Sequence, residues 1–319
     1  MVVLVTGATG FLGRNVVQQL LNHHYTVRCL VHTPGGERVF RNRAVDVYYG
    51  NVLDPDALAL ACQGVESIIS LVAIIRQTRR ATFDKINHQG VANLVIAARE
   101  AGGVKHLVHL SAIGATENTD YPYLRSKWQG EQEIVNSGIP YTLFRPSVLF
   151  GDGDEFLNAL AGMVKALPVV PVVGLGRNRF QPIAVEDVAR CIALTLSRDD
   201  LKGHVLEIGG PQQLSYNEIV SHVVRAMGKR RMRFHIPISL MRLNVMIMEA
   251  LLPRPPITSE QLRMLPNRNV GELGLIEKTF GFTPRALEGN MDFVNSVTFG
   301  GGLQMLLGLR AAKHTESHI

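Results

Sequence analysis

The sequence predicts an α/β fold in which helices cover both faces of a parallel β-sheet. Short β-branched runs alternate with longer helical patterns through the first half of the 319 residues. Several of these runs are apolar at nearly every position, as expected for parallel strands that are buried on both faces. A glycine-rich turn follows the first run directly and opens the first helix. Together these features are typical of a doubly wound sheet.

The strands expected in the first half lie at Val2–Thr6, Thr26–Val31, Val45–Tyr49, Ser67–Val72, His106–Leu110 and Thr142–Phe144. The helices expected between them lie at Leu12–Asn22, Asp54–Ala61, Asn87–Ala101 and Tyr123–Asn136. Because a helix separates successive strands, each connection is a crossover and the strands run parallel.

The pattern loosens after Gly151, where we expect a small C-terminal α/β lobe. Its expected elements are helices at Asp154–Leu167, Val185–Leu196 and Ser215–Met227 and short strands near Phe180–Ile183 and Val205–Ile208. We therefore assign residues 1–150 to the sheet core and 151–295 to a lobe that returns elements to that core. Residues 296–319 are expected to form a tail.

The amino-acid composition indicates which kinds of ligand and partner the chain is expected to bind. The chain has 33 Lys and Arg against 27 Asp and Glu, a mild excess that favours anionic partners such as phosphate-bearing cofactors or acidic lipid surfaces. No zinc-finger spacing and no aromatic RNA-binding motif is visible, so nucleic acid is not expected. Cys29, Cys62 and Cys191 stand in apolar runs and are expected to be buried thiols. The eleven histidines show no metal-like pairing, so no metal site is expected.

The N-terminus lacks a basic segment and a cleavage site of the secretory type, which favours a cytoplasmic protein. One segment qualifies this expectation. Ile236–Leu252 is almost wholly apolar, but its 17 residues include Arg242 and Glu249, so it falls short of a membrane span. It is expected to be a buried or partner-facing helix. The alternative is peripheral contact with the inner face of a membrane or with a membrane complex.

The glycine-rich turn indicates a dinucleotide site of the Rossmann type. Its glycines allow the backbone to turn tightly and to approach a pyrophosphate, which then lies at the positive end of the first helix. Strand, turn and helix occur in the required order, which makes the pattern specific. The residues expected to contact the cofactor here are Gly7, Thr9, Gly10, Phe11, Leu12 and Gly13.

The second strand bears on the choice of cofactor. It ends at His32-Thr33 without the acid that would bond a ribose 2′-hydroxyl and repel a 2′-phosphate. His32 and Arg14 are placed to face a 2′-phosphate. NADP(H) is therefore favoured, and NAD(H) remains open.

Further contacts are expected along the same edge of the sheet. Asn51 and Val52 follow the third strand, where an adenine edge would lie, and Ala73 ends the fourth strand beside the ribose. Asn87 opens the next helix, where it is either a helix cap or a ligand contact.

These residues resemble a known group. The resemblance to extended and atypical short-chain dehydrogenases/reductases of the NAD-dependent epimerase/dehydratase type rests on Thr6–Gly13, Asn87, Tyr123-Leu124-Arg125-Ser126-Lys127, Arg145-Pro146-Ser147, Phe150-Gly151 and Pro182–Ala189. It covers the chain to about Asn295. The segment from Leu252 through Val270 looks most similar to bacterial relatives of the NAD(P)H-binding accessory subunit of respiratory complex I.

The resemblance implies a catalytic pair, and the sequence departs from the group's pattern at a third catalytic residue. Tyr123 would be the general acid/base, and Lys127, on the same helix face, would bond the nicotinamide ribose and lower the pKa of the phenol. Pro146 would lie beside the nicotinamide. The third catalytic residue is usually the second of a Ser-Ser or Ser-Thr pair, but here Ser111 takes the first position and Ala112 the second. A group shifted by one residue would point to the opposite face.

Two functions follow. One is an oxidoreductase or epimerase/dehydratase that acts on an unidentified small molecule through Tyr123 and Lys127. The alternative is a catalytically weak or silent NADPH-binding protein that stabilises or assembles a membrane-associated complex such as complex I. An NADP-sensing regulator has no separate support. The oligomeric state is not readable from the residues. Members of the group that the chain resembles often dimerise through the helix that carries Tyr123, so a homodimer is one expectation.

Overall fold

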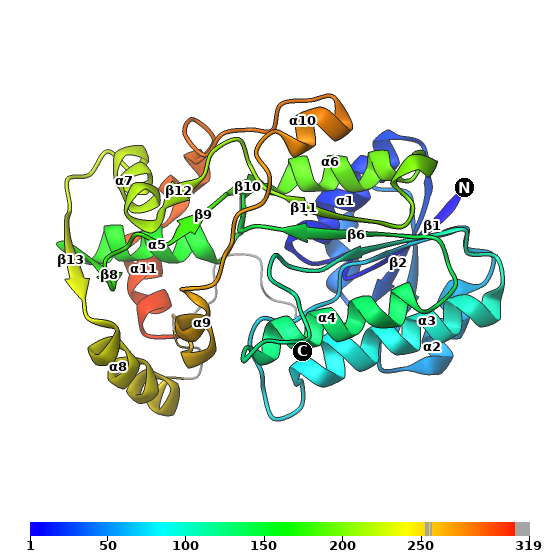
Figure 1. Cartoon of the computed structure of the whole chain (residues 1–319), viewed down its shortest axis with the longest axis horizontal. Helices are drawn as coiled ribbons and strands as arrows, with labels where there is room; N and C mark the ends of the chain where they lie inside the picture. The colour runs from blue at the N-terminus through cyan, green and yellow to red at the C-terminus, as the bar shows by residue number, and fades with distance from the viewer. Residues whose placement is uncertain (253–254, 256, 310–319) are drawn as a thin grey trace. The chain divides into compact units, whose positions relative to one another are not determined.

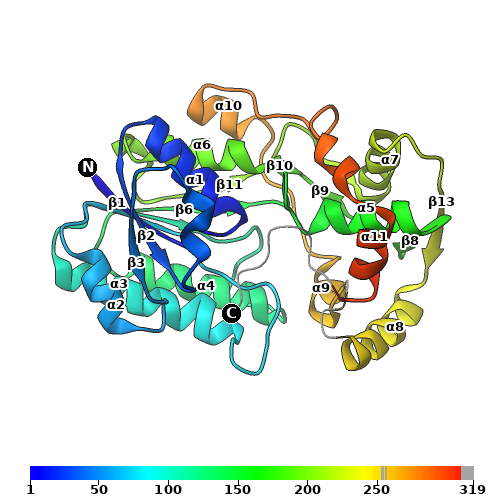
Figure 2. The same ribbon diagram turned by 180° about the vertical axis from the view of Figure 1, so that it is seen from behind.

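The computed structural model describes residues 1–252, 255 and 257–309. These residues form two compact units. The first unit holds residues 1–146 and 185–208, and the second holds 147–184 and 209–309. Figures 1 and 2 show the chain from opposite sides.

The first unit is built on a seven-stranded sheet in the order β11-β6-β5-β4-β1-β2-β3, and every strand pair is parallel. Its strands are β1 (Val2–Thr6), β2 (Thr26–Val31), β3 (Val45–Tyr49), β4 (Ser67–Ser70), β5 (His106–Leu110), β6 (Tyr141–Pro146) and β11 (His204–Ile208). The chain reverses its direction across the sheet between β1 and β4. Ligands of doubly wound proteins bind beyond the carboxyl ends of the strands at this kind of switch point.

Helices cover both faces of this sheet (Figure 1). Its helices are α1 (Phe11–Asn22), α2 (Pro55–Cys62), α3 (Gly90–Ala101), α4 (Pro122–Val135) and α6 (Val185–Thr195). Helices α1 and α6 pack together on one face, and α2, α3 and α4 line the other. Leu4, Ile68 and Leu107 stand in register across three neighbouring strands and belong to the core beneath α2–α4. The predicted doubly wound sheet is confirmed.

The second unit is a smaller α/β assembly. Its longer elements are α5 (Phe156–Ala166), β8 (Val169–Val173), α7 (Tyr216–Ala226), β13 (Met232–Ile236), α8 (Ile238–Leu251), α9 (Ser259–Met264), α10 (Leu275–Phe280) and α11 (Phe299–Leu306). Strands β8 and β13 pair in parallel. The two-residue strands are β7 (Leu149–Phe150), which pairs with β10 (Ile183–Ala184), and β9 (Arg179–Phe180), which pairs with β12 (Leu214–Ser215).

Several elements differ from those expected. The strand expected at Phe180–Ile183 is two separate strands, β9 and β10, with different partners. The segment expected to be a tail from residue 296 includes α11, which packs on α5, and residues 310–319 lie outside the described residues. A Cβ added to Gly302 would lie 2.7 Å from the Gly162 carbonyl oxygen, so only glycine allows these two helices to approach so closely.

The apolar segment Ile236–Leu252 forms helix α8, which is mostly exposed among the described residues. Of the expected alternatives, burial is therefore excluded within this part of the chain, and a partner-facing helix stays a prediction. Only Met241 and Val245 of α8 are buried. The helix has 14 residues. Among the described residues, no helix is long and apolar enough to cross a membrane.

Candidate functional site

The glycine loop joins β1 to α1 at the switch point of the sheet. Gly7 adopts a left-handed backbone conformation (φ +72°), and the Gly10 amide donates to the Gly7 carbonyl at 3.1 Å. A Cβ added to Gly13 would lie 2.0 Å from the Gly7 carbonyl oxygen, because the first turn of α1 packs directly on the loop. Gly7 in turn lies against the backbone of Leu71 and Val72, just beyond β4.

The N-terminus of α1 is open to an anion. Its N-cap is Gly10, no side chain caps it, and no acidic residue occupies its first turn. The first amide groups of a helix lack internal partners and carry the positive end of the helix dipole. Thr9 and Phe11 are half-buried beside this end, Leu12 is buried, and Arg14 is half-buried one turn further on. This cradle of close-packed glycines and unpaired amides fits a pyrophosphate.

The turn after β2 comes back to the glycine loop. His32 is exposed, and its Nδ1 lies 3.1 Å from Thr33 Oγ1. Gly35 is left-handed (φ +92°), and the short helix Gly36–Phe40 follows it. A Cβ added to Gly36 would lie 3.7 Å from the Thr9 side chain. This turn therefore stands next to the loop that would hold the cofactor.

Two functional candidates in this turn were missed by the sequence analysis. Glu37 Oε2 accepts a hydrogen bond from the Gly35 amide at 2.8 Å, which ties this carboxylate to its own turn. Arg38 is exposed, and a Cβ added to Gly35 would lie 3.9 Å from its Nε. The sequence Pro34-Gly35-Gly36 is the signal that could have found them, because Pro and paired glycines mark a tight turn directly after the second strand.

The expected adenine and ribose contacts lie beyond the ends of β3 and β4, which β1 and β2 separate in the sheet. Asn51 Oδ1 accepts from the Leu53 amide at 2.7 Å, so the two Nδ2 hydrogens of its side chain remain for a ligand. Val52 is buried, and its carbonyl accepts from Asn93 Nδ2 at 3.0 Å. Ala73 is exposed just beyond β4.

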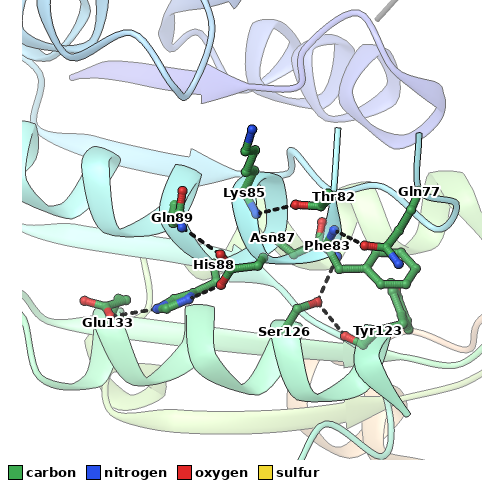
Figure 3. A network of polar contacts seen from close by, with 11 residues as sticks. Gln77, Thr82, Phe83, Lys85, Asn87, His88, Gln89, Tyr123, Ser126 and Glu133 are labelled. Atoms are coloured by element: carbon green, nitrogen blue, oxygen red, sulfur yellow. Dashed lines mark hydrogen bonds and ion pairs between the residues drawn. The ribbon is translucent and has the colours of Figure 1, made fainter. Parts of the chain in front are cut away.

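Asn87 is not a helix cap. It lies inside a π-helical segment, Asp84–Gln89, which runs directly into α3. Its fully buried amide accepts from the Ile74 amide at 2.9 Å and donates to the Ile74 carbonyl and to Ser126 Oγ, both at 3.1 Å. Figure 3 shows Asn87 between its own helical turn and α4. All of its donors are used within the protein, so Asn87 fixes the chain after β4 to α4.

Tyr123 lies in the first turn of α4. Its ring packs edge-on against Phe83, with the ring centres 5.6 Å apart, and its carbonyl accepts from Ser126 Oγ at 2.7 Å (Figure 3). Burial raises the pKa of Tyr123 to about 12. This is the opposite of the lowering expected from Lys127. The phenol is therefore protonated at neutral pH and able to donate a proton.

Lys127 is one helical turn further along and is buried at the end of β5. Its Nζ donates to the Leu110 carbonyl at 2.6 Å. Burial lowers the pKa of Lys127 to about 8, although the Glu131 carboxylate acts in the opposite direction. The Nε and Nη2 atoms of Arg145 donate to the two carboxylate oxygens of Glu131, at 2.8 and 2.5 Å. Lys127 and Glu131 on α4 and Arg145 on β6 thus form a row of alternating positive and negative groups.

Buried polar groups cross the sheet beside Lys127. Thr6, Ser70 and His109 stand in register on β1, β4 and β5, and Ser70 Oγ lies 3.1 Å from His109 Nδ1. Burial, followed by the charge on Lys127, holds the pKa of His109 well below its usual value, so the ring is neutral. Within the described part of the chain, Thr6 Oγ1 and His109 Nε2 have no hydrogen-bond partner.

Ser111, the candidate for the third catalytic residue, follows β5 directly. Its Oγ is buried with no partner among the described residues, and its amide donates to the Phe144 carbonyl at 2.6 Å. Ala112, the next residue, is only half-buried. Pro146 is buried at the end of β6, and its carbonyl accepts from the Ile113 amide at 3.3 Å. Ala112 thus carries no hydroxyl, and the buried hydroxyl of Ser111 precedes it by one residue.

Comparison with known proteins identifies the group. Residues 3–209 match the model of the NAD dependent epimerase/dehydratase family, and this match includes the glycine loop and α4. The chain belongs to that family. It is therefore an NAD(P)-binding, oxidoreductase-like protein of Rossmann fold.

Two curated relatives and one solved structure illustrate the range of this family. The Arabidopsis thaliana protein named NADH dehydrogenase [ubiquinone] 1 alpha subcomplex subunit 9 is 32% identical over 226 residues, which are 68% of this chain and 56% of that subunit. This chain thus spans little more than half the length of that relative. A ceramide reductase of Caulobacter vibrioides is 29% identical over 74% of each chain. A triphenylmethane reductase of Citrobacter sp. shares the fold, with a TM-score of 0.75, 21% identity and coverage of 93% of this chain and 100% of that one.

Proposed function

We propose that this chain binds NADP(H) and reduces the carbonyl group of a small molecule, with Tyr123 as the proton donor. One observation carries the proposal. Tyr123 and Lys127 share a face of α4 at the same edge of the sheet as the glycine loop. Lys127 is buried and bonds the Leu110 carbonyl, and Tyr123 is half-buried against Phe83. A protonated phenol next to a cofactor that delivers hydride is suited to reduction.

The cofactor would lie across the switch point. Its pyrophosphate would bind the uncapped start of α1, and Asn51 and Val52 would meet the adenine. The ribose would pass Ala73, and the nicotinamide would lie near Pro146. Arg38 and Arg14 would supply positive charge to a 2′-phosphate, and His32 would be a further contact. Glu37 is an acid in the same turn, hydrogen-bonded to the Gly35 amide, so the proposed preference for NADP(H) over NAD(H) depends on the two arginines outweighing its charge.

The chemistry divides between the cofactor and the protein. When bound, the nicotinamide supplies a hydride. Tyr123 would donate its proton to the carbonyl oxygen, and Lys127, with donors left beyond its bond to Leu110, would orient the ribose and stabilise the phenolate that remains. No hydroxyl at position 112 would polarise the carbonyl, so turnover is expected to be slow.

A second candidate is a cofactor-binding protein with little or no turnover that supports a membrane-associated complex. Two observations favour it: the buried, misplaced hydroxyl of Ser111 beside Ala112, and the 32% identity to the complex I subunit. In this case the cofactor would stabilise the fold of the first unit rather than react.

Titration calorimetry with NADPH, NADH, NADP⁺ and NAD⁺ tests the binding. We expect micromolar or tighter affinity for NADPH. Arg38→Ala should weaken NADPH binding by about tenfold, since one phosphate contact is lost, and leave NADH binding unchanged. Arg99→Ala, on the exposed surface of α3, is the matched control. If none of the four forms binds, both candidates fail.

Turnover distinguishes the two candidates. NADPH oxidation is followed with a panel of aldehydes and ketones for the wild type, Tyr123→Phe and Ala112→Ser. A reductase loses its rate in Tyr123→Phe while it keeps NADPH affinity, and gains about a hundredfold when the missing hydroxyl is restored. Tight NADPH binding with no turnover in any of the three proteins would establish the second candidate instead.

A further inference from the structure

Helix α8 of the second unit presents an apolar face that the described residues leave uncovered. Its buried side, Met241 and Val245, packs against Leu262 of α9. Its opposite side carries large apolar residues at helical spacing, all of them exposed: Leu240, Leu243, Ile247 and Leu251. A soluble helix normally places polar residues on its outer face, so this face needs a partner.

The exposed apolar surface continues into the segments next to α8. Met232 and Phe234 occupy one face of the edge strand β13 and are 76% and 61% exposed. β13 leads through Pro237 directly into α8, and no other element lies between them in either view (Figures 1 and 2). We call these residues the α8 surface: Met232, Phe234, Leu240, Leu243, Ile247 and Leu251.

The charges around the α8 surface are mostly of one sign. Between residues 229 and 252 the basic residues are Lys229, Arg230, Arg231, Arg233 and Arg242, and Glu249 is the one acid. The Glu249 carboxylate accepts hydrogen bonds from the Ser259 amide and hydroxyl, at 2.8 and 2.5 Å. Lys229, Arg230 and Arg242 are exposed. The surface thus combines apolar side chains with available positive charge.

We propose that the α8 surface binds the interface of an anionic phospholipid membrane. Its apolar side chains would enter the boundary between headgroups and acyl chains, and the exposed basic side chains would meet lipid phosphates. A 14-residue helix is about 21 Å long, which suits a helix that lies in the plane of the membrane. A second copy of this chain is a poorer occupant, because two such surfaces would bring like charges together. The proposal does not depend on cofactor binding.

Vesicle flotation of the full chain tests this proposal. Vesicles of phosphatidylcholine alone are compared with vesicles of equal parts phosphatidylcholine and phosphatidylglycerol, at low and high salt. We expect binding to the anionic vesicles that weakens with salt. The variant Leu243→Glu/Ile247→Glu should bind at least about tenfold less, and Lys229→Glu/Arg230→Glu should lose the preference for anionic lipid.

Ile96→Glu is the matched control, because Ile96 is an equally exposed isoleucine on helix α3 (55% against 49% for Ile247). It should bind vesicles as the wild type does. Thermal unfolding of each variant confirms that it is folded. Absence of binding to either vesicle, or binding that both surface variants retain, overturns the proposal. A dimer in light scattering that Leu243→Glu/Ile247→Glu dissociates also overturns it and assigns the surface to a second copy.

Discussion

At the scale of single residues, Asn87 joins the chain beyond β4 to helix α4 through one carboxamide. The Ile74 amide and carbonyl and the Ser126 hydroxyl all bond to it in the interior. We predict that Asn87→Ala lowers the free energy of unfolding by about 3 kcal/mol, because it leaves these buried groups without partners. Urea denaturation measures the change.

Asn93→Ala is the comparison for this substitution. Asn93 makes one side-chain hydrogen bond, to the Val52 carbonyl, and is only half-buried. Its loss should cost about 1 kcal/mol. Equal effects of the two substitutions would mean that the position of Asn87 in the network adds nothing beyond an ordinary amide.

At the scale of elements, the contact between the glycine loop and α1 sets the geometry of the site. We predict that Gly13→Ala lowers stability by about 2 to 4 kcal/mol and weakens NADPH binding, because the added methyl meets the backbone of Gly7. Backbone atoms cannot rotate away as a side chain can. Gly300→Ala is the control, since nothing lies within 4 Å of its added Cβ and alanine favours the helix. Thermal unfolding and calorimetry follow both variants, and an unaltered Gly13→Ala protein would contradict this account of the loop.

At the scale of the whole molecule, buried ionisable groups make stability depend on pH. Lys127 has a folded pKa of about 8, below the value of about 10.4 for an unfolded lysine, so the unfolded chain binds more protons between these values. This group therefore adds stability as pH rises from 8 to 10. The three buried thiols, whose pKa values burial raises, act in the opposite direction over the same range.

The difference between wild type and Lys127→Met isolates the lysine. We predict that the free energy of unfolding of the wild type rises relative to that of Lys127→Met by up to about 1.4 kcal/mol per pH unit between pH 8 and 10. Urea denaturation at three pH values measures it. Parallel pH profiles would show that Lys127 keeps an ordinary pKa in the folded protein.

Sequence patterns were sufficient to locate those strands whose residues are buried on both faces of the sheet. Val2–Thr6 is apolar at every position but the last, so a short apolar run was enough to locate this strand. β13, in contrast, reads Met-Arg-Phe-His-Ile and lies mostly exposed; its alternation of apolar and polar residues is the strand signal that the sequence analysis missed. A helix within Ile236–Leu252 was predicted, and α8 forms there. How much of it is exposed depends on which other elements pack against it, and the sequence of the helix does not contain this information.

The candidate site was predictable in outline, and its details depended on tertiary contacts. The glycine loop and the spacing of Tyr123 and Lys127 are local patterns, and the sequence contains them in full. The spacing to Lys127 suggested a lowered pKa for Tyr123, whereas burial raises it, and burial depends on residues distant in the sequence such as Phe83. Arg38 was missed because the left-handed Gly35 returns the chain toward Thr9, and such a return is not visible in strand periodicity.

The π-helical turn at Asp84–Gln89 has a consequence for chain length. Such a turn holds one residue more than an ordinary helical turn, and it places Asn87 toward Ile74 and Ser126. Removal of one residue would let an α-helix run straight through, with the flanking side chains rotated little. The residues within the turn would shift, however, and Asn87 would no longer be aimed at both Ile74 and Ser126. This stretch should therefore accept changes of residue type at its exposed positions far more readily than a change in the number of residues.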